Sequence, residues 1–305
     1  GQALSDQHTF PARLAASSLV LDVIQAGNRY IAVGERGHIL LSDDGQEWRQ
    51  SLDVPTRSNL TSVYFRGGKL WAAGHDAVVI HSADLGESWH VQYSDPDAEQ
   101  PLMDIVFTDV DHGIAIGAYS LVLTTSDGGE NWQADSMVDL VTGELSDLIN
   151  ANELEGNGLE LADDDSLATD TDQDDEFLDE GIEYHLNAIL ELGDEMLLVA
   201  AEAGNGYRSD DAGQNWYHFT FPYAGSMFGL IAEDAACILA YGLRGHIQRS
   251  CDNGESWTEL NNSNLGSLFG AAQDAGGIAL VGANGALVRV APKTDTASLQ
   301  DLDSG

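Results

Sequence analysis

The sequence repeats one short pattern five times. In each copy an aspartate is followed two residues later by glycine and five residues later by tryptophan, and five of the six tryptophans occupy that last position. Successive copies of the tryptophan are separated by 41, 43, 84 and 41 residues, so one interval of a regular repeat is doubled. A period of about 42 residues is typical of propellers, solenoids and repeat arrays. The repeated residues are Asp43, Gly45, Trp48; Asp84, Gly86, Trp89; Asp127, Gly129, Trp132; Asp211, Gly213, Trp216; and Asp252, Gly254, Trp257.

The stretch TTSDGGENW, residues 124–132, indicates what the pattern does. Glycine adopts positive φ without steric cost, and an aspartate carboxylate accepts hydrogen bonds from backbone N–H groups a few residues further on. Trp132 then supplies a large apolar anchor directly after a tight turn. We therefore interpret the aspartates, glycines and tryptophans of the pattern as structural residues.

Short apolar runs precede each copy, as in VLDVIQAGNRYIAVGERGHILLS at residues 20–42. Runs of four to seven residues rich in Val, Ile and Leu, with Gly or Asp between them, predict β-strands. The repeat therefore predicts an all-β propeller of four-stranded blades. A sixth copy at 265–290 has three strands but no aspartate turn, so we expect six blades. The doubled interval leaves seven blades as the alternative.

These boundaries predict one propeller domain over residues 1–291 and a C-terminal tail over 292–305. The sixth copy has no fourth strand of its own. We expect the N-terminal segment 1–18 to supply that strand, from within TFPARLAASS at residues 9–18, because ring closure removes open strand edges.

The pattern S/T-x-D-x-G-x-x-W resembles the Asp-box (BNR) turn. The longer stretch AVGERGHILLSDDGQEW, residues 32–48, resembles the photosystem II stability/assembly factor family of propellers, which has non-photosynthetic bacterial relatives. The resemblance covers most of residues 19–291, although Leu41 replaces the hydroxyl residue usual at the first box position. It implies a non-catalytic role in assembling or supporting a membrane-protein complex.

The charge balance is extreme, with 12 basic residues against 51 acidic residues and a net charge of −39. Such a chain repels nucleic acid and anionic lipid, so we expect no nucleic-acid partner. No apolar run is long enough to cross a bilayer, so we expect no direct membrane insertion. We expect the chain to be a monomer on its own.

The two cysteines, Cys237 and Cys251, fall in the same predicted blade. They are placed symmetrically about the turn between two predicted strands, and cross-strand partners lie about 5 Å apart, within reach of a disulfide. Two free thiols in a reducing compartment are the alternative. A disulfide, together with a chain that begins at Gly1, favours a periplasmic or secreted protein whose signal peptide has been removed.

An acidic insertion occupies residues 134–184, with 18 acidic residues and no Lys or Arg. We expect a mobile or partly helical loop. Asp170, Asp172 and Asp174 alternate like the first ligands of a calcium loop, but Asp175 and Gly181 replace the required glycine and glutamate. Calcium is therefore a weak candidate, and we predict no other metal and no cofactor.

We name the two ends of the predicted propeller by their turns. The box face carries the Asp-box turns between third and fourth strands. The connection face carries the turns between second and third strands and the connections between blades, including the insertion. Arg36 and Arg244 fall at equivalent turns of that face, and guanidinium groups bind carboxylates bidentately. The candidate partner-binding residues are Arg36, His38, His75, Tyr119, Tyr207, Arg244 and His246.

The sequence predicts a non-catalytic scaffold that binds a membrane-protein complex, or its assembly intermediate, through the connection face. A transporter is a possible complex of this kind. The alternative is an Asp-box glycoside hydrolase or a sugar-binding protein, because a catalytic carboxylate pair could lie among 51 acidic residues. Sialidases resemble one another in an Arg-Ile-Pro motif and three substrate-binding arginines, and this chain lacks that motif.

Overall fold

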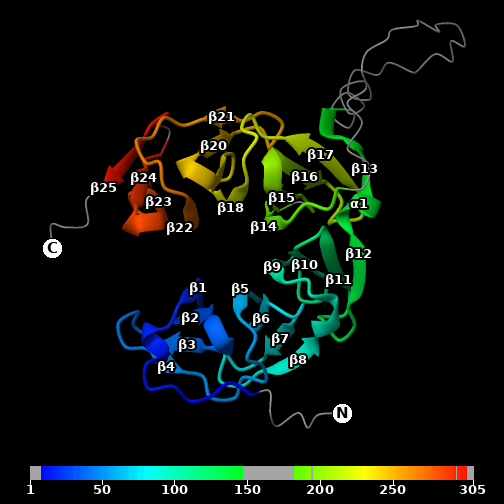
Figure 1. Cartoon of the computed structure of the whole chain (residues 1–305), viewed down its shortest axis with the longest axis vertical. Coiled ribbons are helices and arrows are strands. Elements are labelled where there is room, and N and C mark those ends of the chain that lie inside the picture. The colour runs from blue at the N-terminus through cyan, green and yellow to red at the C-terminus, as the bar shows by residue number, and fades with distance from the viewer. Residues whose placement is uncertain (1–7, 147–181, 194, 293, 301–305) are drawn as a thin grey trace, which may run out of the picture.

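The computed structural model describes residues 8–146, 182–193, 195–292 and 294–300. Six sheets radiate around a common axis, and in each sheet four strands that follow one another along the chain pair in antiparallel order from the centre outward (Figure 1). Helix is scarce in these ranges, and α1 (Met137–Leu140) is a single turn. The prediction of an all-β, six-bladed propeller is confirmed.

The blades follow the chain in order. Their strands are β1 (Val20–Ala26), β2 (Arg29–Gly34), β3 (Ile39–Ser42) and β4 (Arg49–Gln50); β5 (Leu60–Arg66), β6 (Lys69–Gly74), β7 (Val79–Ser82) and β8 (His90–Tyr93); β9 (Leu102–Phe107), β10 (Gly113–Gly117), β11 (Leu121–Thr125) and β12 (Gln133–Ser136); β14 (Leu186–Glu191), β15 (Leu197–Ala201), β16 (Asn205–Ser209) and β17 (Trp216–Thr220); β18 (Met227–Ala232), β19 (Ile238–Gly242), β20 (Ile247–Ser250) and β21 (Thr258–Glu259); β22 (Leu268–Asp274), β23 (Gly277–Gly282), β24 (Leu287–Val290) and β25 (Ala297–Gln300).

The fourth strand of the sixth blade is β25, from the C-terminal side of the chain. The expectation that residues 9–18 supply this strand was therefore wrong, and residues 297–300 are not a tail. The N-terminal segment lies on blade one, where Ala15 in the short 3-10 helix η2 (Ala15–Ser17) packs on Ala32 and Leu40. Alanines can cover an apolar sheet face without adding a strand, and the sequence pattern does not separate the two roles.

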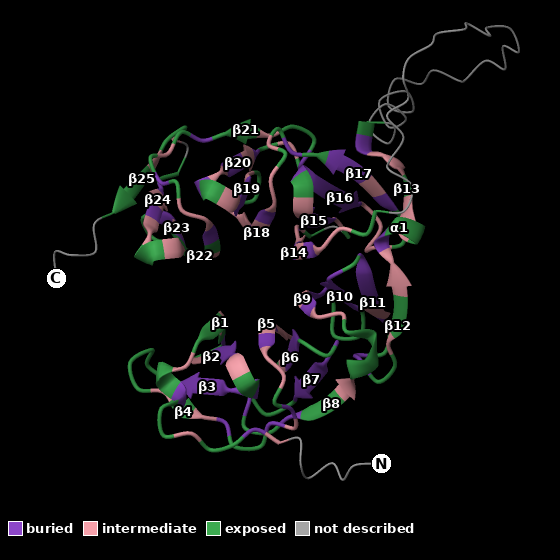
Figure 2. Ribbon diagram, in the orientation of Figure 1, coloured by how far each residue is buried: buried purple, intermediate pink, exposed green. Residues whose placement is uncertain are grey.

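Apolar side chains on both faces of the sheets build the core. Five clusters of buried residues each join two consecutive blades. Figure 2 shows buried residues concentrated within the strands and exposed residues in the turns and at the outer strands. Each blade is thus held by its neighbours rather than by a core of its own.

Four of the Asp-box turns have one hydrogen-bond pattern. In blade four the Ser209 hydroxyl donates to Asp211 and accepts from the Gly213 N–H, while Asp211 accepts from the N–H of Asn215. The box tryptophan then lies against the preceding blade, and Trp216 is fully buried. The structural interpretation of the pattern is confirmed for these turns.

Blade one departs from this pattern. Its box hydroxyl is Ser42 and its box carboxylate is Asp44, which accepts from the N–H groups of Gln46 and Glu47. The predicted Asp43 instead pairs with Arg29 at 2.8 Å. Alignment on the tryptophan selected the wrong aspartate, because the segment from hydroxyl to glycine is one residue shorter here.

The first residues of the acidic insertion belong to the fold. After β12 and α1, the strand β13 (Val141–Glu144) pairs in parallel with β17 and makes blade four five-stranded. Glu144 fixes this strand by contacting Nδ1 of His218 at 3.0 Å, and Leu145 is buried in the cluster between blades four and five. The predicted loop therefore begins later than residue 134. Most of it lies outside the described residues.

The disulfide prediction is confirmed. Cys237 and Cys251 are bonded, with their Cα atoms 4.1 Å apart, across the β19–β20 hairpin of blade five. The bond closes a short loop that contains both strands.

Removing this bond should destabilise the protein. A Cys237→Ser/Cys251→Ser variant should lose about 3 kcal/mol of unfolding free energy, since a loop of about 15 residues regains its conformational freedom in the unfolded chain. Urea unfolding with and without dithiothreitol provides the measurement. The reductant should lower the stability of the wild type and leave the variant unchanged; equal sensitivity of both would refute the bond.

Box tryptophans should differ in their contribution to stability. Trp216→Ala should cost about 3–5 kcal/mol, because a fully buried indole leaves a cavity between two blades. Trp48→Ala should cost clearly less, since Trp48 packs against the small cluster around Ala15 and the Tyr30 ring of its own blade. Denaturant unfolding of both variants tests this, and equal losses would show that Trp48 takes part in packing between blades.

Candidate functional site

The connection face is built from six copies of one tight turn. In each copy the two central residues of the turn between the second and third strands both have positive φ, as in the type I′ turns that join twisted strands. The first residue of each pair is exposed. These first residues are Arg36, Asp76, Tyr119, Ala203, Arg244 and Asn284.

Arg36 and Arg244 occupy equivalent positions, and both are exposed. The N–H of Arg36 donates to Oδ1 of Asn59 at 2.9 Å, and the N–H of Arg244 lies 3.3 Å from Oγ of Ser267. Each arginine is thus anchored through its backbone to the following connection between blades. Within the described part of the chain, no ion pair engages its guanidinium.

The arginines divide by the partners of their side chains. Arg36, Arg57 and Arg244, all on the connection face, have no carboxylate partner among the described residues, and neither does Arg13 of the N-terminal segment. The other six pair with carboxylates; these are Arg29, Arg49, Arg66, Arg208, Arg249 and Arg289. In so acidic a chain, the unpaired guanidiniums concentrate on one face.

Two further predicted residues remain accessible on this face. His75 is exposed, and Tyr119 is half-exposed with its ring edge-on to His185 at 4.8 Å. Arg57 is an additional accessible cation that sequence reasoning missed; it lies 3.9 Å over the Phe10 ring. The sequence signal for Arg57 was a basic residue in a connection between blades. Its contact with Phe10 could not be predicted, because it depends on how the N-terminal segment folds back.

Three predicted residues are not free to bind a partner. His38 is buried against the hydroxyl of Ser18, and burial lowers the pKa of its imidazole. Tyr207 is buried in the core between blades three and four, where burial raises its pKa to about 12. His246 stacks on Tyr223 at 3.5 Å and contacts a carboxylate of Glu259.

The correction for Tyr207 follows from its position in the strand. Tyr207 follows the turn by four residues and therefore lies within strand β16, whereas Ala203 occupies the turn position equivalent to Arg36. All five residues of β16 are buried, because both faces of this sheet pack against neighbouring blades. Proximity to a turn in sequence was not sufficient to place a side chain on the surface.

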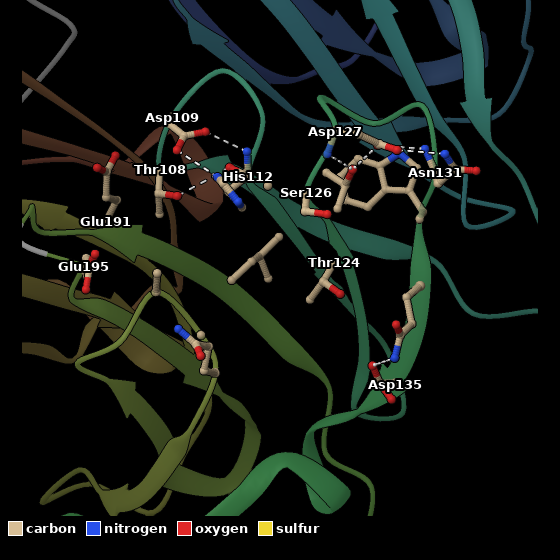
Figure 3. A pocket seen from close by; sticks show the side chains of 18 of the residues that line it. Thr108, Asp109, His112, Thr124, Ser126, Asp127, Asn131, Asp135, Glu191 and Glu195 are labelled. Atoms are coloured by element: carbon tan, nitrogen blue, oxygen red, sulfur yellow. Dashed lines mark hydrogen bonds and ion pairs between the residues drawn. The ribbon is translucent and has the colours of Figure 1, made fainter.

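A cavity of about 1010 Å³ lies on the box face, between blades three and four (Figure 3). Ile114, Trp132 and Leu140 give it an apolar lining, and carboxylates surround it. Backbone N–H groups of His112 and Asp111 lower the pKa of Asp109 to about 2. The lining carboxylates are Asp109, Asp127, Asp135, Glu191 and Glu195.

Several of these carboxylates already have partners. Glu191 pairs with Arg66 at 2.8 Å, Asp109 contacts His112, and Asp127 accepts from Asn131 within its box. Across the described ranges, no three His, Cys, Asp or Glu side chains converge as a metal site would require. The weak calcium candidates Asp170, Asp172 and Asp174 lie outside the described residues. Nor does any helix of the described chain reach the length and apolarity of a membrane span.

Two aspartates link innermost strands around the central axis. Asp22 accepts from the N–H of Val63 at 2.9 Å, and Asp104 accepts from the N–H of Ile189 at 2.9 Å. An innermost strand has one unpaired edge, so its N–H groups need such acceptors. Burial raises the pKa of Asp22 to about 7, although backbone hydrogen bonds act in the opposite direction, and burial also raises the pKa of Asp104.

The raised pKa of Asp22 predicts a pH-dependent stability. Its folded-state pKa of about 7 exceeds the ordinary aspartate pKa of 3.8, so the folded protein holds this proton more tightly than the unfolded chain does. The resulting stabilisation is complete below about pH 4 and is lost as the pH rises through 7, at up to about 1.4 kcal/mol per pH unit.

Asp22→Asn removes the titration and should change this dependence. Between pH 5 and pH 7 the variant should gain roughly 2 kcal/mol of unfolding free energy relative to the wild type. Urea unfolding of both proteins at one-unit intervals from pH 4 to pH 8 isolates the effect from the general charge repulsion that they share. A difference that stays constant with pH would contradict the shifted pKa.

Comparison with known proteins fits this architecture. The family model described as "Photosynthesis system II assembly factor YCF48" matches residues 92–262, more than half of the chain. The chain belongs to this family. The resemblance stated from the Asp-box repeats is thereby confirmed.

One curated relative and several solved structures extend the YCF48 comparison. "Photosystem II assembly lipoprotein Ycf48" of Synechococcus sp. (strain CC9902) is 33% identical over 123 residues, and the match spans 38% of this chain but only 35% of that protein. The structure "YCF48 bound to D1 peptide" aligns with TM-score 0.63 and 18% identity over 94% of this chain and 82% of the other. "YCF48 from Cyanidioschyzon merolae" aligns with TM-score 0.63 and 16% identity, covering 97% and 88%. At these identities the structural likeness shows the fold.

Proposed function

We propose that this YCF48-family chain is a non-catalytic assembly or accessory factor. It binds a polypeptide segment of a membrane-protein complex, or of an assembly intermediate, through its connection face. The observation that carries the proposal is the pair of exposed arginines, Arg36 and Arg244, at equivalent turns. Neither guanidinium has a carboxylate partner within the described residues.

The chemistry of these groups defines the ligand. A guanidinium presents a planar fork of donors that matches a carboxylate bidentately. With a net charge of −39, the rest of the molecule repels acidic partners, so unpaired cations on one face determine where such a partner can approach. The type I′ turns fix the backbone at both arginines, so only the side chains lose conformational freedom on binding.

The relatives support this kind of role. One is named an assembly lipoprotein of photosystem II, and another is titled as bound to a D1 peptide. For this chain we propose the same general activity, namely recognition of a peptide segment during assembly, with a transporter as one possible complex. The Cys237–Cys251 bond and the lipoprotein relative support a periplasmic or secreted location. The family role also makes a scaffold the better hypothesis than the glycoside hydrolase or sugar-binding alternative.

A crosslinking pull-down from native membranes tests the proposal. The intact chain should recover one membrane complex, and an Arg36→Ala/Arg244→Ala variant should recover at least about tenfold less, since each guanidinium–carboxylate contact contributes about 1.5 kcal/mol or more. An Arg49→Ala/Arg289→Ala variant is the matched control, because it removes the same charge from arginines that are already paired.

Thermal unfolding must first show that both variants are folded. Equal recovery by the two variants would refute a role for the connection-face arginines. Failure of the intact chain to recover any complex would refute the scaffold function itself.

A further inference from the structure

At one register position of the innermost strands, the residue is exposed in blade one and buried in the other blades. Val20, the first residue of β1, is 42% exposed. Its equivalents, Leu60, Leu102, Leu186, Met227 and Leu268, each have 0% exposure and lie in the cluster shared with the preceding blade. Val20 has the same apolar character but no preceding blade to cover it.

Other apolar residues of blade one and blade six are also exposed where their equivalents in other blades are buried. Val23 of β1 is 52% exposed, whereas its equivalent Val63 in blade two is 2% exposed. On blade six, Val281 is 50% exposed, whereas its equivalent Val33 in blade one is buried completely. No hydrophobic cluster of the described chain joins blade six to blade one, and the ribbon is open between β22 and β1 (Figure 1).

We call this open boundary the seam and define it by Val20, Val23, Phe269 and Val281. The N-terminal segment covers only the outer part of the blade-one wall, through Ala15. Phe269 is 60% exposed and lies 5.6 Å from the Phe228 ring. The seam therefore presents two apolar walls to solvent.

The unpaired arginines lie on blade one and on blade five, one to each side of the seam. Arg36 follows Glu35, whose N–H donates to the carbonyl of Leu19, the residue that precedes β1, and its own N–H donates to Asn59 in the connection to blade two. The N–H of Arg244 contacts Ser267, two residues before Phe269, at the boundary between blades five and six. One arginine is thus on the blade that carries Val20, and the other borders the blade that carries Phe269 and Val281.

We propose that the seam binds an extended segment of the partner that carries apolar side chains flanked by carboxylates. This inference rests on the proposed function and specifies its ligand. In an extended chain, successive side chains point to opposite sides, so a single strand can contact both apolar walls at once. The flanking carboxylates pair with Arg36 and Arg244, which supplies the charge complementarity that the remaining surface lacks.

A second copy of this chain suits the seam less well. Two copies would bring together surfaces that each carry a large negative net charge. The partner segment is therefore the occupant to which the proposal commits.

Fluorescence anisotropy with designed peptides tests the proposal directly. The probe is a labelled twelve-residue peptide that alternates leucine with serine and has glutamates at both ends. One control peptide replaces the leucines with serine, and the other replaces the glutamates with lysine. The full chain should bind the probe at least about tenfold more tightly than it binds either control.

Variants of the chain locate the binding. Phe269→Ser/Val281→Ser should weaken probe binding by at least about tenfold, since it removes apolar contacts from the blade-six wall. Val91→Ser/Val110→Ser is the matched control, because these two exposed valines lie on blades two and three. Both pairs are exposed, so thermal unfolding should show that both variants keep the fold.

Each result supports or overturns the proposal. Equal affinity for all three peptides, or unchanged binding by Phe269→Ser/Val281→Ser, overturns it. Concentration-dependent dimerisation that this variant abolishes, seen by analytical ultracentrifugation, overturns it in favour of a second copy. In the membrane pull-down, loss with the arginine variant but full recovery with Phe269→Ser/Val281→Ser would leave the proposed function standing and exclude the seam as its site.

Discussion

Every sheet in this protein has two apolar faces, and only neighbouring sheets can cover them. A single four-stranded sheet buries little by itself, so blade stability depends on the packing between consecutive blades. The Asp-box contributes to this packing, since its tight turn sends a tryptophan against the preceding blade. Trp216 and Trp257 therefore support both their own turns and the boundary behind them. The dependence on neighbours also explains why the two terminal blades carry the exposed apolar residues.

The distribution of charge is a second constraint. Most arginines are paired with carboxylates, which limits repulsion within a chain of such negative charge. Arg36 and Arg244, at equivalent turns, are exceptions, because neither has a carboxylate partner among the described residues. The result is an acidic molecule with a few free cations on one face. An acidic peptide would be repelled elsewhere and attracted there, which links the fold to the proposed recognition of a partner segment.

The insertion after blade three shows how a repeat fold accepts additional chain. Strand β13 adds to the outer edge of blade four in parallel, and the contact of Glu144 with His218 attaches it. β13 has only four residues, VTGE, so the sequence shows no apolar periodicity that would predict this strand. The cavity on the box face lies beside this addition, between blades three and four. Local sequence patterns cannot predict such an attachment, because the partner strand is more than 70 residues away.

The sequence alone determined the repeat, the strands, the turns and the pairing of Cys237 with Cys251, because each depends on residues close together in the chain. The sequence also predicted that Arg36 and Arg244 lie at equivalent turns. Only the tertiary structure decided that β25 completes the last blade and that Tyr207 is buried. It alone left Val20 and Val281 uncovered. These outcomes depend on which faces meet across the ring, and packing between distant segments carries no signature in a local pattern.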